Sequence, residues 1–495
     1  MKPLVPLFVV IPLGAAFLIP ILSKVWRRFS EIIGGIASAS ILFLSGYFLF
    51  NLRSGIVYPV GGWLAPFGIV FVVDKLSVFF VFVIALIWFL SYLFAINYMD
   101  RYTGGWKFYT LFSLMHAGMM GVAITGDLFN LFVFLEIASV SSYALVGFSV
   151  EEEGLEAGFK YMVMGEIASL FILLGIAFVY ASFSTLNMAD ISLSLASATK
   201  NAVYYFVFAL FVFGFSLKSA AFPFHSWLPD AHPAAPAPVS AVLSGVFIKI
   251  LGIYSLSRIV FNVFGLSRAN APGIFNILLL LGILSIIFAG LAALVQRDYK
   301  RILAYSSISQ IGYIIAGFGI GNIWGIIGAL LHVLSHAMGK GLLFLTSGSV
   351  VYRTEERDIE KMAGFGVRMP WTGYSYLFGM LSLSGIPPFI GFFSKLFLLI
   401  GAVKQSMYGV AVIFVIFSAV TFAYLLRIEN KVFWEKTVKG FSDSPFLMVF
   451  SMVILVLLLL VSGLCFSHIT KEFVKPAAEV LLRGVLYAKD ILGGI

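Results

Sequence analysis

The sequence predicts an all-α integral membrane protein with about fourteen transmembrane helices. Of its 495 residues, 61% are hydrophobic and only 11% are charged, whereas soluble domains carry about 25% charged residues. Many of its apolar runs reach the ~20 residues that a helix needs to cross a bilayer. Two runs are interrupted, one around Pro223 and one around Pro387, which predicts discontinuous helices. The composition therefore excludes a water-soluble protein.

The fourteen expected spans follow from hydropathy along the chain. They lie at 4–23, 30–51, 72–97, 107–125, 127–148, 158–182, 201–222, 237–261, 273–295, 301–318, 322–348, 370–403, 406–427 and 444–467. The first run lacks the charged start and the cleavage site of a signal peptide, so we expect it to be a span. Proline in the seventh and twelfth spans frees a backbone carbonyl, which must face protein or water rather than lipid. The two breaks therefore point to a cavity.

The two breaks also suggest an internal repeat. They lie ~165 residues apart, and interrupted spans at matching places in two halves indicate a transport site. We expect N-terminal helices at 1–106, a first inverted five-helix unit at 107–262 and a second at 273–428. Residues 444–495 would hold the last helix and a short amphipathic segment. Chance alignment of apolar runs is the alternative explanation.

Charge placement bears on orientation and partners. Loops after odd-numbered spans carry more Lys and Arg, which predicts that these loops are cytoplasmic and that both termini are extracellular, in a cell membrane. The net charge of +9 does not indicate a nucleic-acid partner, because the basic residues are scattered. The single Cys465 excludes an internal disulfide and a cysteine-ligated cluster.

Ionisable residues inside the spans carry the functional argument. Each charge at the membrane centre costs roughly 2.5–3.5 kcal/mol on insertion scales and marks an ion pathway. Away from the span ends, we expect four of the 32 basic residues inside spans: Lys218, Lys249, Lys340 and Lys395. Glu136 lies centrally in the fifth span. A carboxylate that moves toward or away from a buried lysine changes the proton affinity of that lysine, as a proton pump requires. A structural ion pair, or lysines that reach the surface, is the alternative.

His332, His336 and Lys340 recur every four residues, so they share one helix face. Histidine titrates near neutral pH, which favours a proton relay. Structural hydrogen bonding is an alternative, whereas zinc is disfavoured because there is no HExxH motif and no nearby cysteine. Lys395 follows the second break, where a path could leave the second unit.

Four further residues are weaker candidates. Glu166 lies in the sixth span and could face Glu136 or a buried lysine. His225, Asp230 and His232 lie in the Pro-rich stretch after the first break, where they could line an access route or anchor the loop. The acidic run at 151–156 is expected to be a solvated helix start. We expect no cofactor and no metal, because no nucleotide loop, cluster-ligand set or nucleophile motif is present.

Three motifs resemble the antiporter-like subunits of respiratory complex I and the D-type subunit of Mrp cation/proton antiporters. They are LE at 135–136, FSLKSAAFPFHSWLPDAH at 215–232 and LSGIPP at 383–388. The resemblance covers nearly the whole chain and implies two inverted five-helix units with broken seventh and twelfth helices. It also implies a set of functional residues: a Glu136–Lys218 pair, a central Lys249, His332 and His336 between the halves, and an exit lysine at Lys395.

The resemblance implies a proton-translocating subunit of a multi-subunit oxidoreductase or sodium/proton-exchange complex. Its partners would be other membrane subunits, and this chain would carry no redox or hydrolytic chemistry of its own. Some complex I relatives have His in the eighth span and Glu in the twelfth, where this chain has lysine. The short segment after the last span and the scarcity of Cys and Gln favour the antiporter-like, H-type subunit of an archaeal membrane-bound hydrogenase or its sulfane sulfur reductase relative. A non-conducting scaffold that docks a redox arm or a sodium module, and an independent metabolite transporter, are the competing hypotheses.

Overall fold

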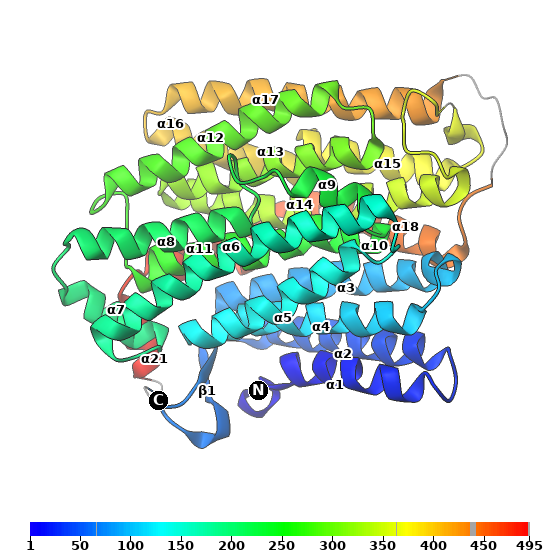
Figure 1. Ribbon diagram of the computed structural model, residues 1–495. Helices are drawn as coiled ribbons and strands as arrows, with labels where there is room; N and C mark the ends of the chain where they lie inside the picture. The colour runs from blue at the N-terminus through cyan, green and yellow to red at the C-terminus, as the bar shows by residue number, and fades with distance from the viewer. Residues whose placement is uncertain (66, 363, 436–441, 494–495) are drawn as a thin grey trace.

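The computed structural model describes residues 1–65, 67–362, 364–435 and 442–493, and the chain is almost entirely helical (Figure 1). Within these residues, eleven helices are long and apolar enough to cross a membrane. The long helices lie side by side in one bundle (Figure 1). The predicted all-α membrane fold is thus confirmed, while the count of fourteen spans and the inverted repeat stay predictions.

The N-terminal part forms one side of the bundle. Its elements are η1 Lys2–Leu4, α1 Leu7–Leu22, α2 Phe29–Asn51, β1 Ile56–Pro59, η2 Val60–Gly62, β2 Val70–Val73, α3 Lys75–Tyr98 and η3 Met99–Arg101. The antiparallel hairpin of β1 and β2 was not predicted, because its strands are only four residues long. Asp74 caps α3 by accepting hydrogen bonds from the backbone N–H groups of Leu76 and Ser77.

The first broken helix lies in the next part of the chain. Its elements are α4 Gly105–Ile124, α5 Leu128–Val146, α6 Glu152–Phe183, α7 Met188–Ser197, α8 Ala202–Lys218 and α9 Leu228–Ala234. The seventh span was predicted to reach residue 222, but α8 ends at Lys218. Ala220 has a left-handed backbone with φ of 55°, and Pro223 has no N–H for a helical bond. The acidic run does stand at a helix start, that of α6.

The predicted eighth span is helical but irregular. It comprises α10 Ala237–Val242, η4 Leu243–Phe247, η5 Lys249–Tyr254, α11 Ser255–Ser257 and η6 Arg258–Val263. The three η segments are π-helical. A π turn bonds residue i to i+5 and is frequent at functional sites. Residues 237–263 are almost fully enclosed by other helices.

The second half repeats the pattern of long helices around one break. Its elements are α12 Pro272–Val295, α13 Tyr299–Ile320, α14 Ile323–Thr354, η7 Phe365–Val367, α15 Pro370–Ser384, α16 Ile390–Lys404, α17 Tyr408–Ile428 and η8 Glu429–Trp434. The break between α15 and α16 coincides with the GIPP motif, where Gly385 adopts a φ of 83° that favours glycine. The central helix α14 is buried at nearly every position and packs against α13, α15, α16 and α18.

The chain ends on a membrane helix and a short lateral segment. These elements are α18 Phe446–Leu464, α19 Phe466–Ile469, η9 Thr470–Val474, α20 Lys475–Leu482 and α21 Leu486–Leu492. The apolar face of α20 packs against α3, α14 and η6, and α21 packs against α7. Ala477, Ala478 and Leu481 on that face are fully buried. The C-terminal segment therefore holds both halves together at one end of the bundle.

Candidate functional site

Glu136 of α5 and Lys218 at the end of α8 lie together. The Lys218 Nζ is 3.8 Å from Glu136 Oε1, with side chains that are 3% and 21% exposed for lysine and glutamate. The same ammonium donates to Ser139 Oγ at 2.9 Å and to Tyr143 OH at 3.3 Å. Two neutral oxygens thus accept hydrogen bonds from the Lys218 ammonium. The Glu136 carboxylate lies slightly farther away than hydrogen-bond distance.

Two residues of α6, Ser169 and Glu166, lie near Glu136. Ser169 of α6 donates a hydrogen bond to Glu136 Oε1. Glu166, one turn earlier on α6, is partly exposed and is close enough to interact electrostatically with both Glu136 and Lys218. The sequence did not indicate which way the Glu166 side chain faces, and the structure places it beside the Glu136–Lys218 pair.

The broken end of α8 contacts the π-helical segment that carries Lys249. Ser219 packs so closely on Gly252 that a β-carbon there would lie 2.4 Å from the Ser219 Cβ. Lys249 is 1% exposed and donates to the carbonyl oxygens of Ser244, at 2.6 Å, and Gly245. A π turn shifts the backbone pairing, so that carbonyls of the preceding turn are accessible to this side chain.

Hydroxyl groups connect Lys249 to Lys340 of α14. The Ser244 and Ser307 hydroxyls are 2.6 Å apart, and Ser307 donates to the Leu303 carbonyl at 2.8 Å. The same carbonyl accepts from Lys340 Nζ at 3.0 Å. Both lysines are thus held by backbone oxygens of neighbouring segments, η4 and α13, which touch through two serines.

His332 and His336 differ in their surroundings, although both are fully buried. His332 Nδ1 is 2.9 Å from Ser394 Oγ, and its Nε2 is 3.0 Å from Gln310 Oε1. The Ser394 hydroxyl can turn between donating to Nδ1 and donating to the Gly391 carbonyl, 2.8 Å away. Ser394 and Gln310 can therefore accommodate both the neutral and the protonated imidazole. Neither ring nitrogen of His336 has a protein partner among the described residues.

Lys395 lies just past the second break. Its Nζ donates to the Ser384 carbonyl at 3.3 Å, where α15 ends, and stands 5.1 Å from the centre of the Tyr313 ring. The Tyr313 ring is also a neighbour of the His332 ring, with ring centres 5.6 Å apart. Lys395 is 8% exposed, so the second break does not bring it to the surface of the chain.

The three candidates after the first break have separate surroundings. Asp230 forms surface ion pairs with Lys160 at 3.3 Å and Arg301 at 3.2 Å, which anchor the loop. His225 is partly exposed. His232 is fully buried, and both of its ring nitrogens lack a protein partner in the described part of the chain.

Some buried charges were not predicted from the sequence. Arg258, near the end of the expected eighth span, was not predicted to be a buried charge, but it is 5% exposed and pairs with Asp74 at 2.6 Å. Lys300 was placed in a loop but is 3% exposed at the start of α13. Glu429 is 2% exposed and accepts from the Trp434 indole. Asp74 and Lys300 each border an apolar run, and that position was their one sequence signal.

Ion pairing separates these groups into two classes. Within residues 1–65, 67–362, 364–435 and 442–493, Lys249, Lys340 and Lys395 have no carboxylate oxygen within 4 Å, whereas Lys218 and Arg258 each have one. An ammonium group held only by neutral oxygens in a dry interior loses its proton more easily than one in an ion pair. The same residues contain no cluster of three His, Cys, Asp or Glu side chains suited to a metal.

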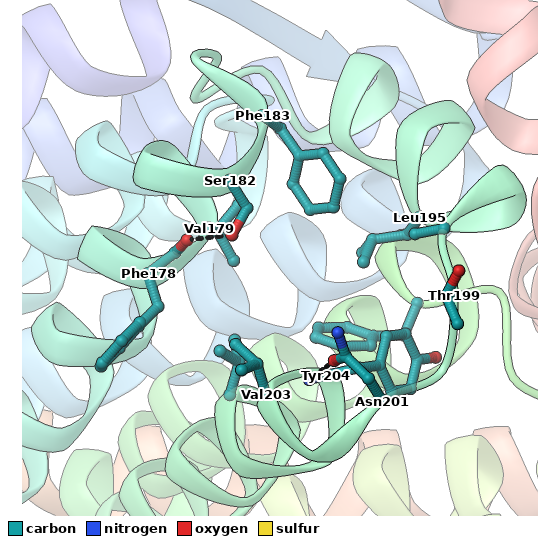
Figure 2. Close-up of a pocket in the computed structure, with 12 residues that line it drawn as sticks. Phe178, Val179, Ser182, Phe183, Leu195, Thr199, Asn201, Val203 and Tyr204 are labelled. Atoms are coloured by element: carbon teal, nitrogen blue, oxygen red, sulfur yellow. Dashed lines mark hydrogen bonds between the residues drawn. The ribbon is translucent and has the colours of Figure 1, made fainter.

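The cavity in Figure 2 lies apart from these groups. It has a volume of 430 Å³ and is lined mainly by apolar side chains of α6, α7 and α8, such as Phe178, Leu195 and Val203 (Figure 2). None of the candidate residues borders it.

Comparison with known proteins shows the family of this chain. Residues 125–421 match the family described as NADH:quinone oxidoreductase/Mrp antiporter, TM. The chain is 38% identical over 376 residues to the N-type subunit of the NADH-quinone oxidoreductase of Desulforudis audaxviator, covering 75% of this chain and 74% of that protein. It is 30% identical over 498 residues to the D-type subunit of the Na⁺/H⁺ antiporter of Alkalihalophilus pseudofirmus, covering 99% and 100%.

A solved structure extends the similarity to the whole fold. A chain of the membrane-bound sulfane sulfur reductase, an archaeal respiratory membrane complex, superposes with a TM-score of 0.92 at 30% identity and covers 98% of this chain and 99% of that one. The protein is a multi-pass membrane protein. It belongs to the transmembrane family of NADH:quinone oxidoreductase and Mrp antiporter subunits.

Proposed function

We propose that this chain is the antiporter-like subunit of a multi-subunit membrane complex and that it moves protons along its buried Glu, Lys and His residues. The observation that carries the proposal is the series of buried and partly buried ionisable groups that follows neighbouring helices from α5 to α16. Its members are Glu136, Lys218, Lys249, His336, His332 and Lys395. Hydroxyls or backbone carbonyls contact Lys218, Lys249 and His332, and such groups can pass or hold a proton.

The contacts suggest how each group acts. Glu136 sets the proton affinity of Lys218, because the 3.8 Å distance between Lys218 Nζ and Glu136 Oε1 can shorten or lengthen with small movements of α5. Protons occupy Lys218 or Lys249 in the first half. They cross through the His336 and His332 face, where Ser394 and Gln310 can accommodate both protonation states of His332. They leave by Lys395.

The architecture proposed for this path has fourteen spans. The eleven long helices, together with α4, α8 and the α15–α16 pair, account for that number. Two inverted five-helix units at 107–262 and 273–428 would each contain one break. The excess of basic residues in odd-numbered loops supports a cytoplasmic position for those loops and an extracellular position for both termini.

The partners follow from the relatives. The names of the similar proteins are those of subunits of an NADH-quinone oxidoreductase, a Na⁺/H⁺ antiporter and a sulfane sulfur reductase. We propose that this chain likewise assembles with other membrane subunits, and that energy comes from a redox arm or an ion gradient. Sodium favours oxygen ligands, and a path rich in lysine and histidine supplies few, which favours the proton as the ion carried.

The test replaces Glu136 or Lys218 in the assembled complex. We expect Glu136→Gln and Lys218→Ala to reduce proton flux into vesicles at least tenfold without loss of assembly. Matched controls are Glu152→Gln and Lys361→Ala, both at exposed positions, which should leave flux and assembly unchanged. Normal flux in both site variants would refute the mechanism. Loss of assembly with unchanged flux per complex would favour the scaffold alternative.

A further inference from the structure

A polar cavity opens at the end of the bundle where the loops after α3, α5 and α14 meet. Its volume is 430 Å³, and its wall includes Tyr102, Glu153 and Arg357. Arg357 pairs with Glu153 at 2.7 Å and with Asp298 at 3.5 Å. Burial raises the pKa of Asp298, against the hydrogen bond from the Arg301 N–H and the charge of Arg357. The rim is thus a solvated, charged mouth at the protein surface.

Lys300 and Ala235 also line this cavity. Lys300 stands in the first turn of α13 and is 3% exposed. Its Nζ donates to the Ala235 carbonyl, directly after α9, at 2.8 Å. One of the three ammonium protons is thus engaged, and the structure gives this ammonium no carboxylate within 4 Å among the described residues. Lys300 therefore separates the solvated mouth from the interior.

His232 lies on the inner side of this contact. It stands on the short helix α9, three residues before Ala235, and the centres of its ring and the Phe344 ring of α14 are 4.5 Å apart. Both ring nitrogens are buried and unpartnered among the described residues. The imidazole is close enough to Lys300, Lys249 and Lys340 to interact electrostatically with all three. A buried imidazole without a hydrogen-bond partner costs free energy of folding. Such a cost is expected at a histidine whose ring nitrogens must be free to accept and release a proton.

We infer that Lys300 takes up protons from the cavity and passes them to His232, which delivers them to Lys249 or Lys340. The inference rests on the proposed function and adds a route from solvent to the centre of the path. The Lys300 ammonium gives its proton to a free ring nitrogen of His232, and solvent in the cavity then reprotonates the amine. His232 in turn protonates a neutral lysine, so no charge is created or lost.

The decisive variant is Lys300→Arg. Arginine retains the positive charge and can still donate to the Ala235 carbonyl, but it does not release a proton in proteins. In the assembled complex in vesicles, we expect Lys300→Arg and Lys300→Ala each to lower proton flux at least tenfold. Lys300→His should keep part of the flux, with a pH profile moved toward acid because imidazole titrates lower than an amine. Wild-type flux in Lys300→Arg would overturn the relay and leave Lys300 a structural cation.

Two controls keep the test decisive. The same three substitutions at Lys361, an exposed lysine on the loop that carries Arg357, should leave flux unchanged. The second control is a double variant, Lys300→Ala with His232→Gln, which avoids the bulk of arginine. If both residues act on one route, the double variant should lose no more proton flux than either single variant. Losses of flux that multiply would overturn the inference. Absence of flux in the wild-type complex would refute the proposed function itself, which is distinct from a failure of Lys300 variants only.

Discussion

Asp74 and Arg258 form the tightest buried ion pair of the chain's described part, and the structure predicts how much it contributes. The Arg258 Nη2 lies 2.6 Å from Asp74 Oδ1, and the side chains are 6% and 11% exposed for arginine and aspartate. Arg258 also donates to Tyr254 OH at 3.1 Å and to Asn262 Oδ1 at 3.2 Å. Asn262 in turn donates to the Val480 carbonyl of α20 at 2.9 Å. The pair therefore joins α3, η6 and the C-terminal segment.

The perturbation is Asp74→Asn. Asparagine is as good an N-cap as aspartate, so the cap of α3 should survive while Arg258 loses its counter-charge. Breaking a buried ion pair on one side costs about 3–5 kcal/mol. Asp74 borders a 510 Å³ cavity, which lets solvent screen the remaining charge, so we expect about 3 kcal/mol, the lower end of that range. Arg258→Gln should cost less, because the backbone N–H groups at the start of α3 still stabilise the carboxylate.

The assay is a double-mutant cycle on the free energy of unfolding, measured by denaturant titration in detergent. We expect the double variant to cost about 2 kcal/mol less than the sum of the single variants, because it leaves no unpaired charge. The control pair, Arg483→Gln and Asp490→Asn, replaces an ion pair whose side chains are more than half exposed and should change stability little. Additive single-variant costs within about 0.5 kcal/mol would refute the coupling.

Three further outcomes are expected. A β-carbon at Gly391 would lie 1.8 Å from a carbonyl oxygen of α15, whereas nothing lies within 4 Å of the same position at Gly409; Gly391→Ala should therefore lower the melting temperature of the protein, and Gly409→Ala should not. Because burial raises the pKa of Asp298 above 3.8, the folded state binds this proton more tightly than the unfolded state. The wild type, relative to Asp298→Asn, should thus be most stable below about pH 4 and lose that advantage as pH rises through the raised pKa, as thermal unfolding at pH 4 and pH 7 would measure. Gln310→Leu should cost about 1–3 kcal/mol in unfolding free energy, since it leaves a buried nitrogen of His332 unpaired; an unchanged value would show that the ring finds another partner.

The position of most long helices was predictable, because hydropathy is a local property of the chain. The expected span at 273–295 corresponds to α12 at Pro272–Val295, and the break at GIPP falls between α15 and α16. The hairpin of β1 and β2 was not predictable in this way, since two strands of four residues carry no periodic pattern long enough to recognise. The π turns of the eighth span were missed for a similar reason: their residues are as apolar as those of an α-helix.

The contacts between helices were beyond the sequence. That Glu136 could pair with a buried cation followed from its depth, but the choice of Lys218 rested on resemblance alone. Ser394 and Gln310 around His332 come from α16 and α13, 62 and 22 residues away along the chain, and uncharged side chains in apolar spans give no warning of such a role. Depth in the membrane can be predicted from one sequence, whereas partners depend on the packing of several helices.

Lys249 and Arg258 show why depth alone is insufficient to assign a function. Both stand on the same irregular helical segment, nine residues apart, and both are nearly inaccessible to solvent. Arg258 has a carboxylate partner and ties the C-terminal segment to the bundle, while Lys249 is held only by backbone carbonyls of its own helix. An arginine in an ion pair does not exchange its proton, but a lysine held by neutral oxygens does so more readily. A charge in a span therefore indicates a proton path only when its partner leaves the proton free to move.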